Sequence, residues 1–453
     1  MIKILKYGEV ENTELFSRND PLNDVSETVA EIITTVKEGG DKAVAGYNER
    51  FDGYRTEALE VSEVEMREAL AQVEPEFMEV LERAAANIRA FHSRQVRNSF
   101  IINEQDGVVT GQKIIPIERV GVYVPGGSAP LSSTVLMDTI PAKIAGCRDI
   151  IMVSSPDSRG KINPYILAAA HVAGADRIFK AGGAQAIAAL AYGTETIPKV
   201  DKIVGPGSAF VAEAKKQLYG TVSIDMTAGP SEILIVADAK NRPEFIAADL
   251  LSQAEHDRNA SAVLVTDSDE FAVAVRDEIE KQLSQLERYD IARASIDDNG
   301  KIVVADSLMR AIDIANEIAP EHLELCVDEP FEYLDKIRNA GSVFLGRNCP
   351  EAVGDYFAGP NHTLPTGGTA RFFSPLSVDD FVKKTQYIYY SADALDRAAA
   401  DIALFAGREG LTGHARSALI RTESRGAESR GAEAVGTDEA ERLKAEEPKQ
   451  SEQ

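Results

Sequence analysis

The pattern of apolar and polar positions changes once along the chain, near residue 119. Residues 24–96 carry apolar side chains at helical spacing, and Ser62 with Glu65 forms a capping box that predicts the start of a helix. From residue 119 onward, short apolar and β-branched runs predict strands, with helical stretches between nearly all of them. These runs are 119–124, 149–155, 176–181, 201–204, 232–238, 261–267, 301–306, 323–328 and 341–346. Continuous apolar strands that alternate with helices indicate parallel sheets covered on both faces, and therefore a doubly wound α/β fold.

The number of predicted strands suggests two such sheets, with the loop-rich stretch 225–232 as one candidate junction. Residues 346–371 hold many glycines and prolines and show no periodicity. A segment of this kind inside a compact chain is more often functional than filler. Residues 421–453 contain a short repeat, low hydrophobicity and dense charge, which predicts a disordered acidic tail without a catalytic role.

Composition narrows the class of protein. The chain has 453 residues, of which 44% are hydrophobic and 27% charged, as expected for a globular protein with a sizeable core. Its formal net charge of −25 argues against a nucleic acid or an anionic membrane as partner. A well-solvated acidic surface is the simplest explanation, and a salt-rich cytosol is the alternative. The three cysteines form no CxxC pair, and no run reaches the roughly 18 apolar residues of a membrane span. These features predict a cytoplasmic protein.

Gln253 and His256 raise the first question about chemistry. They lie three residues apart in a predicted helix that begins near Pro243, so their side chains would occupy neighbouring turns of one face. Gln253 falls at the edge of the apolar stripe and His256 beyond it, which predicts that neither belongs to the core. In isolation, a solvent-facing pair is a better interpretation than two metal ligands, because zinc-binding helices of the HExxH type use a spacing of four.

Three of the other histidines lie in polar, turn-rich sequence with a carboxylate nearby. The pairs are Glu321 with His322, Asp355 with His362, and Glu409 with His414. Each pair can be a metal ligand with its hydrogen-bonding partner, an acid–base pair, or two exposed neighbours. His92 and His171 lie in ordinary predicted helices and are interpreted as structural.

Glycine-rich turns follow three of the predicted strands, at 123–134, 180–190 and 204–214. A strand–turn–helix unit of this kind can point backbone N–H groups at a pyrophosphate. The third unit begins with G-x-G but has Phe210 where the dinucleotide-binding motif needs its third glycine. Nucleotide binding and simple tight turns are therefore both open.

Taken together, these segments resemble the histidinol dehydrogenase family over roughly residues 5–418. The resemblance is carried by the motifs ERVGVYVPGG, GGAQAIAALAYGT, DKIVGPGSAFV, MTAGPSEILIVAD, LLSQAEHD, APEHLEL, GDYFAGPNHTLPT and EGLTGHA. It implies two incomplete Rossmann-like units, similar to those of aldehyde dehydrogenases, with small helical extensions at both ends. The implied parts are an N-terminal arm at 1–18, a larger discontinuous domain at 19–122 plus 231–376, a smaller domain at 123–230, and a dimer-crossing segment at 377–420.

The resemblance also implies a zinc-dependent homodimer that oxidises L-histidinol to L-histidine, through the aldehyde, with two NAD. The zinc ligands implied by the motifs are Gln253, His256, Asp355 and, from the second subunit, His414. Oxygen and nitrogen ligands without a thiolate suit Zn²⁺, although Co²⁺ and Mn²⁺ would also fit. The metal would act mainly as a template that holds the substrate's imidazole and amino nitrogens.

The remaining roles come from the same matches. His322 would remove the alcohol proton, and Glu321 would activate water for the second oxidation. The implied substrate contacts are Ser231, Gln253, His256, His322, Asp355, His362, Glu409 and His414. Tyr123, Gln185 and Ser208 match NAD-binding positions, although many members have asparagine where this chain has Ser208.

Two alternatives remain at this stage. One is a related zinc- and NAD-dependent dehydrogenase of another amino or sulfo alcohol, and the other is a metal- or nucleotide-binding protein without turnover. A topological question also remains, because Glu321 and His322 precede the strand 323–328, whereas ligands usually bind beyond the carboxyl ends of strands. Either that strand is antiparallel, or the site lies between the two units, which is the favoured explanation.

Overall fold

The computed structural model describes residues 1–11, 15, 25–55, 58–126, 130–227, 229–423 and 425. The predicted tail at 421–453 therefore lies almost entirely outside the described residues. The chain divides into two compact units. The first contains Met1–Val96 and Pro116–Lys383, and the second contains Arg97–Ile115 and Lys384–Gln453.

Helices α2 (Ser26–Asp52), α3 (Glu63–Leu70) and α4 (Pro75–His92) confirm the prediction for residues 24–96. The capping box predicted at the start of α3 is present: the Ser62 hydroxyl accepts from the backbone N–H of Glu65, whose carboxylate accepts from the backbone N–H of Ser62. Apolar residues of all three helices share hydrophobic cores with the five-stranded sheet described next. The predicted domain boundaries stay a prediction.

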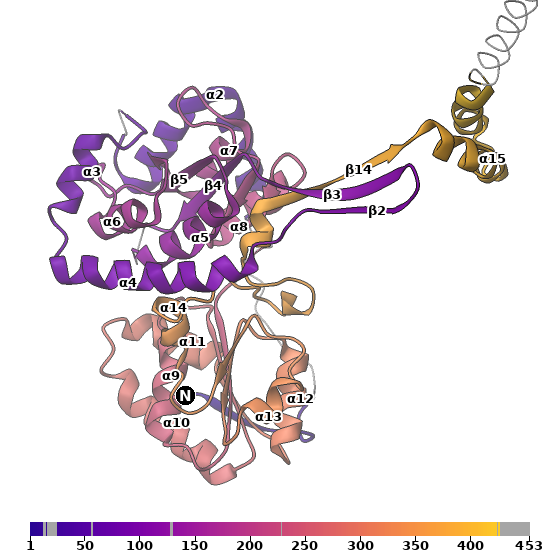
Figure 1. The fold of residues 1–453 in the computed structure, drawn as a ribbon. Coiled ribbons are helices and arrows are strands. Elements are labelled where there is room, and N and C mark those ends of the chain that lie inside the picture. The colour runs from indigo at the N-terminus through magenta and orange to yellow at the C-terminus, as the bar shows by residue number, and fades with distance from the viewer. Residues whose placement is uncertain are drawn as a thin grey trace, which may run out of the picture. The chain divides into compact units, whose positions relative to one another are not determined.

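The five-stranded sheet is parallel throughout and has the order β6-β5-β4-β7-β8. Its strands are β4 (Arg119–Val124), β5 (Asp149–Ser154), β6 (Arg177–Lys180), β7 (Lys202–Val204) and β8 (Ser223–Ile224). Helices α5 (Ser132–Ala145) and α6 (Pro164–Ala173) cover one face, and α7 (Gly183–Tyr192) and α8 (Ala209–Leu218) cover the other (Figure 1). Counted along the chain, the strand order is 3-2-1-4-5, so the direction of winding reverses between β4 and β7.

The six-stranded sheet repeats this order and is also parallel. Its strands are β1 (Lys3–Lys6), β9 (Glu232–Ala237), β10 (Ser261–Thr266), β11 (Lys301–Val304), β12 (His322–Cys326) and β13 (Ser342–Leu345). Strands β9 to β13 again follow 3-2-1-4-5, and β1, from the predicted arm 1–18, is added beside β11. The possibility that residues 323–328 form an antiparallel strand is wrong, because β12 pairs in parallel with both β9 and β13.

Helices cover both faces of this second sheet as well. One core contains apolar residues of α9 (Pro243–Ala254), α10 (Asp269–Leu283) and α11 (Tyr289–Asp298), and the other contains those of α12 (Leu308–Ile318). Short α13 (Phe331–Leu334) follows β12. The prediction of a doubly wound α/β fold is confirmed for both sheets. Within the described residues, none of the helices has the length and apolar character needed to cross a membrane.

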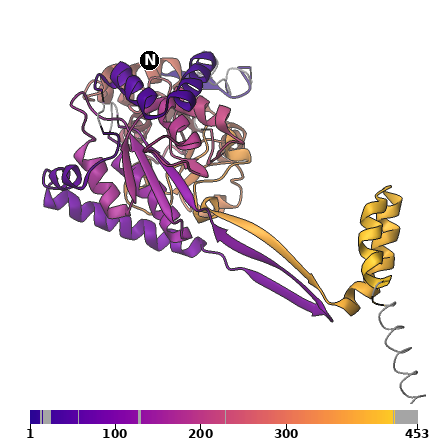
Figure 2. The same cartoon turned by 90° about the horizontal axis from the view of Figure 1, so that it is seen from above.

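The second unit contains strands that the sequence did not predict. Strands β2 (Phe100–Gln105) and β3 (Val108–Pro116) form an antiparallel hairpin, and β14 (Val382–Tyr390) lies on the other side of β3 (Figure 2). Helix α15 (Ala392–Arg408) follows, and residues 412–423 are helical. Residues of β2 and β14 are mostly exposed and those of β3 mostly half-buried, so none of the three strands shows the alternation of a half-buried sheet.

Candidate active site

The predicted catalytic pair lies at the amino-terminal edge of the six-stranded sheet. His322 is the first residue of β12, Glu232 begins β9, and Ser342 begins β13. Ser231 directly precedes β9 and so lies at the same edge. Ligand sites in doubly wound sheets usually lie at the opposite end.

The opposite end of this sheet, where the winding reverses between β9 and β12, is filled by its own side chains. The guanidinium of Arg347 donates to both carboxylate oxygens of Asp238, at 2.9 and 2.8 Å. It also donates to Asp328 at 2.9 Å and to the carbonyl oxygen of Cys326 at 2.8 Å. Asn241 donates to the same carbonyl oxygen at 2.7 Å. This closed end explains why chemistry at the amino-terminal edge does not contradict a parallel β12.

The backbone before β12 is held in an uncommon conformation. Helix α12 ends at Ile318, and the φ of 53° at its C-cap, Ala319, lies in the left-handed region, which costs a non-glycine residue about 1 kcal/mol. Pro320 then leads directly to Glu321. Gly341 packs against this turn so closely that a Cβ there would lie 2.5 Å from the carbonyl oxygen of Glu321. Both neighbours fix the direction in which Glu321 and His322 enter the site.

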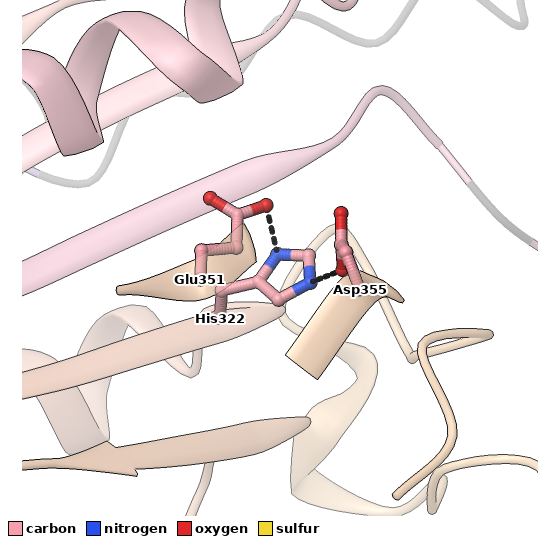
Figure 3. A group of neighbouring side chains, drawn as sticks. All are labelled: His322, Glu351 and Asp355. Carbon is pink, nitrogen blue, oxygen red and sulfur yellow. Dashed lines mark ion pairs between the residues drawn. The ribbon is translucent and has the colours of Figure 1, made fainter. Parts of the chain in front are cut away.

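The imidazole of His322 is buried and has a defined tautomer. Its Nδ1 lies 3.0 Å from the carbonyl oxygen of Glu232, which can only accept, so Nδ1 carries the hydrogen. Its Nε2 lies 3.6 Å from Oδ1 of Asp355, and Nδ1 lies 3.4 Å from Oε1 of Glu351 (Figure 3). Within the described part of the chain, Nε2 has no hydrogen-bond partner. That nitrogen is therefore available to a substrate proton or to a cation.

Carboxylates crowd this imidazole. Burial would lower the pKa of His322, but the charges of Glu351, Glu321 and Asp355 raise it well above its ordinary value. Burial also raises the pKa of Glu321 and of Glu351 to about 8. A buried site with this much acidic character is stabilised either by protons or by a bound cation.

The acidic residues come from a helix that the sequence did not predict. Residues 346–371 were predicted to lack regular structure, but they contain α14 (Glu351–Tyr356). Glu351 and Asp355 lie four residues apart on α14 and therefore share one face. Gly354 permits this arrangement, since a Cβ there would lie 2.6 Å from the ring of Phe344. Glu351 was missed by sequence reasoning, and its spacing from Asp355 was the one signal available.

The structure corrects the prediction for Gln253 and His256. Helix α9 ends at Ala254, so Gln253 lies in its last turn and His256 lies in the turn that follows, not in the helix. Gln253 was predicted to lie outside the core, but it is 0% exposed, whereas His256 is exposed. With its amide oriented to satisfy both partners, Gln253 donates to Glu351 and accepts from the backbone N–H of Glu232 at 3.1 Å. Contacts with Glu351 and Glu232 bury the Gln253 side chain, although the apolar pattern of α9 placed it outside the core.

Asp355 brings three of the histidines together. Burial would raise its pKa, but the nearby imidazoles of His322, His362 and His256 keep the pKa of Asp355 below its ordinary value. His362 Nδ1 lies 3.8 Å from Oδ1 of Asp355, and its Nε2 lies 3.4 Å from the hydroxyl of Thr134. A cavity of about 160 Å³ is lined by residues that include His322, Asp355 and His362.

The residues of this site fit a divalent cation. His322, Glu351 and Asp355 offer ligand atoms that all lie within 4.8 Å of one another. Nitrogen and carboxylate oxygen donors without a thiolate suit Zn²⁺ and other divalent ions of the same series. Glu409 and His414, also predicted to contact the site, belong to the second unit, where both are exposed.

The predicted nucleotide-binding residues belong to the five-stranded sheet. Tyr123 lies near the carboxyl end of β4, and Ser208 precedes α8 after β7, so they flank the point where the winding reverses. The Tyr123 hydroxyl accepts from the backbone N–H of Gly183 at 3.1 Å. Gln185 lies in the first turn of α7 and is buried, with no hydrogen-bond partner for its Oε1 among the residues described. At this reversal point, Asp225 and Lys215 bond the backbone of Gly205, whereas Arg347 bridges the strand ends in the six-stranded sheet.

Gly205 determines the path of the chain where the winding of the five-stranded sheet reverses. Its φ is +114°, and a Cβ there would lie 2.2 Å from the carbonyl oxygen of Tyr123. Only glycine therefore lets the chain leave β7 so close to the end of β4. Close approach of this kind is a feature of turns where a backbone must approach a ligand.

Comparison with known proteins agrees with these observations. The family model for histidinol dehydrogenase matches residues 17–422. Histidinol dehydrogenase from Syntrophotalea carbinolica is 55% identical over 403 residues, which cover 88% of this chain and 93% of that protein. The one from Clostridium acetobutylicum is 51% identical over 426 residues, which cover 93% and 99%. The crystal structure of histidinol dehydrogenase from Elizabethkingia anophelis superimposes with a TM-score of 0.88 at 40% identity, covering 94% of this chain and 99% of that one.

Two parallel sheets of Rossmann-like order, with a buried histidine–carboxylate cluster at the edge of one of them, define the class as an α/β enzyme. The matches make that class specific. The chain belongs to the histidinol dehydrogenase family and is therefore an oxidoreductase.

Proposed function

We propose that this chain oxidises L-histidinol to L-histidine through L-histidinal, with one zinc ion per subunit and two NAD in succession. The observation that carries the proposal is the state of His322. Its Nδ1–H is committed to the carbonyl oxygen of Glu232, so in the neutral imidazole Nε2 is a lone-pair acceptor beside Asp355. A fixed tautomer with a free acceptor nitrogen is what removal of a hydroxyl proton requires.

The zinc ligands in this proposal are Gln253, His256, Asp355 and His414 of a second subunit. Asp355 supports this set, since its charge acts on both His256 and His362. The alternative set of His322, Glu351 and Asp355 is compact, but it would occupy the Nε2 that the reaction needs as a base. Zinc, when bound, would supply a template for the amino alcohol and would offset the buried negative charge.

His322 and Glu321 would each accept a proton in one of the two oxidations. His322 accepts the hydroxyl proton at Nε2 in the first oxidation. Glu321 accepts a hydrogen bond from the backbone N–H of Glu232 at 2.8 Å, and burial raises its pKa to about 8. A carboxylate with a pKa near neutrality can take a proton from the water that hydrates the aldehyde. Bound NAD would accept hydride in both oxidations.

The binding assignments complete the proposal. Ser231, His362 and Glu409 would contact the substrate, and Tyr123, Gln185 and Ser208 would contact NAD. The reversal of winding between β4 and β7 supports the nucleotide site, because ligands bind at such points. The unpaired state of all three cysteines favours a cytoplasmic location.

A homodimer with a shared site is also part of the proposal. The second unit exposes large apolar side chains, among them Ile101 at 63%, Ile388 at 73% and Phe405 at 71%. The four hydrophobic cores of the described chain contain no residue of this unit. Apolar surface of this extent is typical of a protein–protein interface, and a second copy is the partner that would also bring Glu409 and His414.

The test is NADH formation from L-histidinol, measured by absorbance with the zinc-loaded protein. We expect about two NADH per histidinol, loss of activity with a chelator, and recovery when Zn²⁺ is added back. His322→Asn is the matched control and should be nearly inactive. NADH formed with another amino alcohol but not with histidinol would favour a related dehydrogenase instead, and no NADH with any of them would favour a protein without turnover.

A further inference from the structure

Three residues of helix α5, which covers the five-stranded sheet, contact three consecutive residues of the segment that carries His362. The three residues of α5 lie at spacings of three and four, and therefore on one face of the helix. The contacts are Asn361 Nδ2 to the carbonyl oxygen of Met137 at 2.6 Å, His362 Nε2 to the hydroxyl of Thr134 at 3.4 Å, and the Thr363 hydroxyl to Oδ1 of Asp138 at 2.6 Å. His362 is thus held by a helix that covers the five-stranded sheet, whereas His322 belongs to the six-stranded sheet.

Asp138 has a second neighbour, the turn at Gly205. Asp138 is 0% exposed, and its Oδ2 has no hydrogen-bond partner within the described ranges. A Cβ on Gly205 would lie 3.1 Å from that oxygen. Gly205 is itself held tightly, because its N–H donates to Asp225 at 2.8 Å and its carbonyl oxygen accepts from Lys215 at 3.0 Å. Asp225 and Lys215 form a buried ion pair.

One carboxyl group therefore touches both places where ligands are proposed to bind. Oδ1 accepts from the residue after His362, and Oδ2 lies against the turn between β7 and α8. Hydride transfer requires the two bound molecules to meet within about 3–3.5 Å. A buried, hydrogen-bonded link between the two binding locations is rigid enough to fix the distance between the two bound molecules.

We propose that Asp138 and Thr134 are positioning residues, which hold His362 in the active site and make the order of the 361–363 segment depend on nucleotide at the Gly205 turn. This inference rests on the proposed function for the roles of His362 and of the turn. Asp138 touches neither reactant. Its effect passes through Thr363 on one side and Gly205 on the other.

The direct test is hydrogen–deuterium exchange of the peptide that contains residues 361–364, with and without NAD and in the absence of substrate. NAD should slow exchange in the unaltered protein by several fold, because an ordered turn at Gly205 stabilises the contacts of Asp138. In Asp138→Asn and in Thr363→Val, that protection should be lost, while the Kd for NAD measured by calorimetry changes less than about two-fold. Protection that is the same in all of these proteins would overturn the proposal.

Thr139→Val is the matched control. Thr139 is the next residue of α5, is 0% exposed, and its hydroxyl has no hydrogen-bond partner among the described residues. The substitution removes a buried hydroxyl from the same helix and, among the residues described, breaks no hydrogen bond to the 361–363 segment. It should leave both the exchange of residues 361–364 and its response to NAD unchanged. Loss of the response in this control would show a general loosening of α5 and would contradict a specific role for Asp138.

Kinetics provide a second readout. Thr363→Val should raise the KM for L-histidinol roughly ten-fold, in line with the loss of one hydrogen bond to a charged or acidic group, while kcat changes much less. Thr363→Ser, which keeps the hydroxyl, should restore the KM. A fall in kcat with an unchanged KM, or no rescue by serine, would contradict a positioning role. Protein that binds NAD with normal exchange protection but makes no NADH would refute the proposed function and leave the positioning result intact.

Discussion

At His322, burial and three neighbouring carboxylates shift the pKa of the imidazole in opposite directions. The carboxylates prevail and raise the pKa of His322, which without a cation favours the protonated imidazole over the neutral tautomer whose Nε2 can accept a proton. A divalent ion on Asp355 and its neighbours would oppose the carboxylates and return the imidazole to the neutral form. In the proposed mechanism, metal binding and base catalysis are therefore coupled through charge, even where no ligand is shared.

The first prediction separates the two possible ligand sets. His256→Ala should lose zinc during dialysis, because it removes a proposed ligand, whereas His322→Asn should retain about one zinc per chain. Activity should fall in both, by at least 10²-fold for His322→Asn through loss of the base. Zinc content measured by atomic absorption decides the matter. Zinc lost from His322→Asn and retained by His256→Ala would assign the metal to His322, Glu351 and Asp355.

The second prediction concerns Asp138 and the pH dependence of stability. Burial raises the pKa of Asp138 to about 8, so between pH 5 and pH 8 the folded chain keeps a proton that the unfolded chain has released. The folded state binds more protons, and the free energy of unfolding therefore falls as pH rises, by up to about 1.4 kcal/mol per pH unit. Asp138→Asn removes this dependence.

Urea denaturation of both proteins at pH 5, 6, 7 and 8 checks the prediction. The difference between them isolates Asp138 from the other buried acids, whose raised pKa values act in the same direction. The unaltered protein should lose stability relative to Asp138→Asn over this range. A constant difference would mean that Asp138 is charged in the folded protein, and Thr139→Val should follow the unaltered protein throughout.

At the scale of elements, the sequence predicted what burial makes visible. All nine strands predicted between residues 119 and 346 are present. They could be predicted because strands that are buried on both faces are continuous apolar runs in the sequence. Strands β2, β3 and β14 were not predicted, since their apolar residues are exposed or only half-buried and follow no alternation. Helix α14 has six residues, too few for a periodic pattern, so Glu351 was missed although its neighbour Asp355 was predicted from the motif.

Gly354 links α14 to the sheet and gives the third prediction. In Gly354→Ala, the new Cβ would lie 2.6 Å from Phe344, so α14 must shift away from β13 and carry Glu351 and Asp355 with it. We expect a loss of about 1–3 kcal/mol in the free energy of unfolding, together with weaker zinc binding. Gly46→Ala in α2, where a Cβ would meet nothing within 4 Å, is the control and should be neutral or stabilising.

Denaturation curves and zinc titrations of the two variants test this account. Phe344→Leu combined with Gly354→Ala should recover part of both losses, because the smaller side chain leaves room for the Cβ. Equal stability and equal zinc affinity in Gly354→Ala and the unaltered protein would show that α14 does not depend on this contact.

For the whole molecule, the two sheets share one strand order, but their proposed sites lie at opposite ends. The five-stranded sheet has the turn of Gly205 where its winding reverses, whereas Arg347 fills the equivalent point of the six-stranded sheet. The proposed catalytic residues of the six-stranded sheet lie at its amino-terminal edge, where His322, Glu232 and Ser342 begin their strands. Periodicity could predict both sheets, but it could not predict which end of each would carry a site, because that depends on side chains such as Arg347.

The last prediction tests whether two chains share each site. His322→Asn and His414→Ala should each be nearly inactive, the first through its own chain and the second because its imidazole is missing from the partner's site. When the two are co-expressed, half of the dimers formed at random contain one of each, and each of these has one complete site. Activity should therefore recover to about one quarter of that of the unaltered protein, as the two-fold symmetry of a homodimer requires.

Co-expression of His322→Asn with His256→Ala is the control, because both changes lie in the first unit and no pairing of those chains yields a complete site. It should show no recovery. Recovery confined to the pair that combines the two units can arise only if His414 acts in the site of another chain. If the His322→Asn and His414→Ala pair also stays inactive while gel filtration shows mixed dimers, His414 acts within its own chain or not at all.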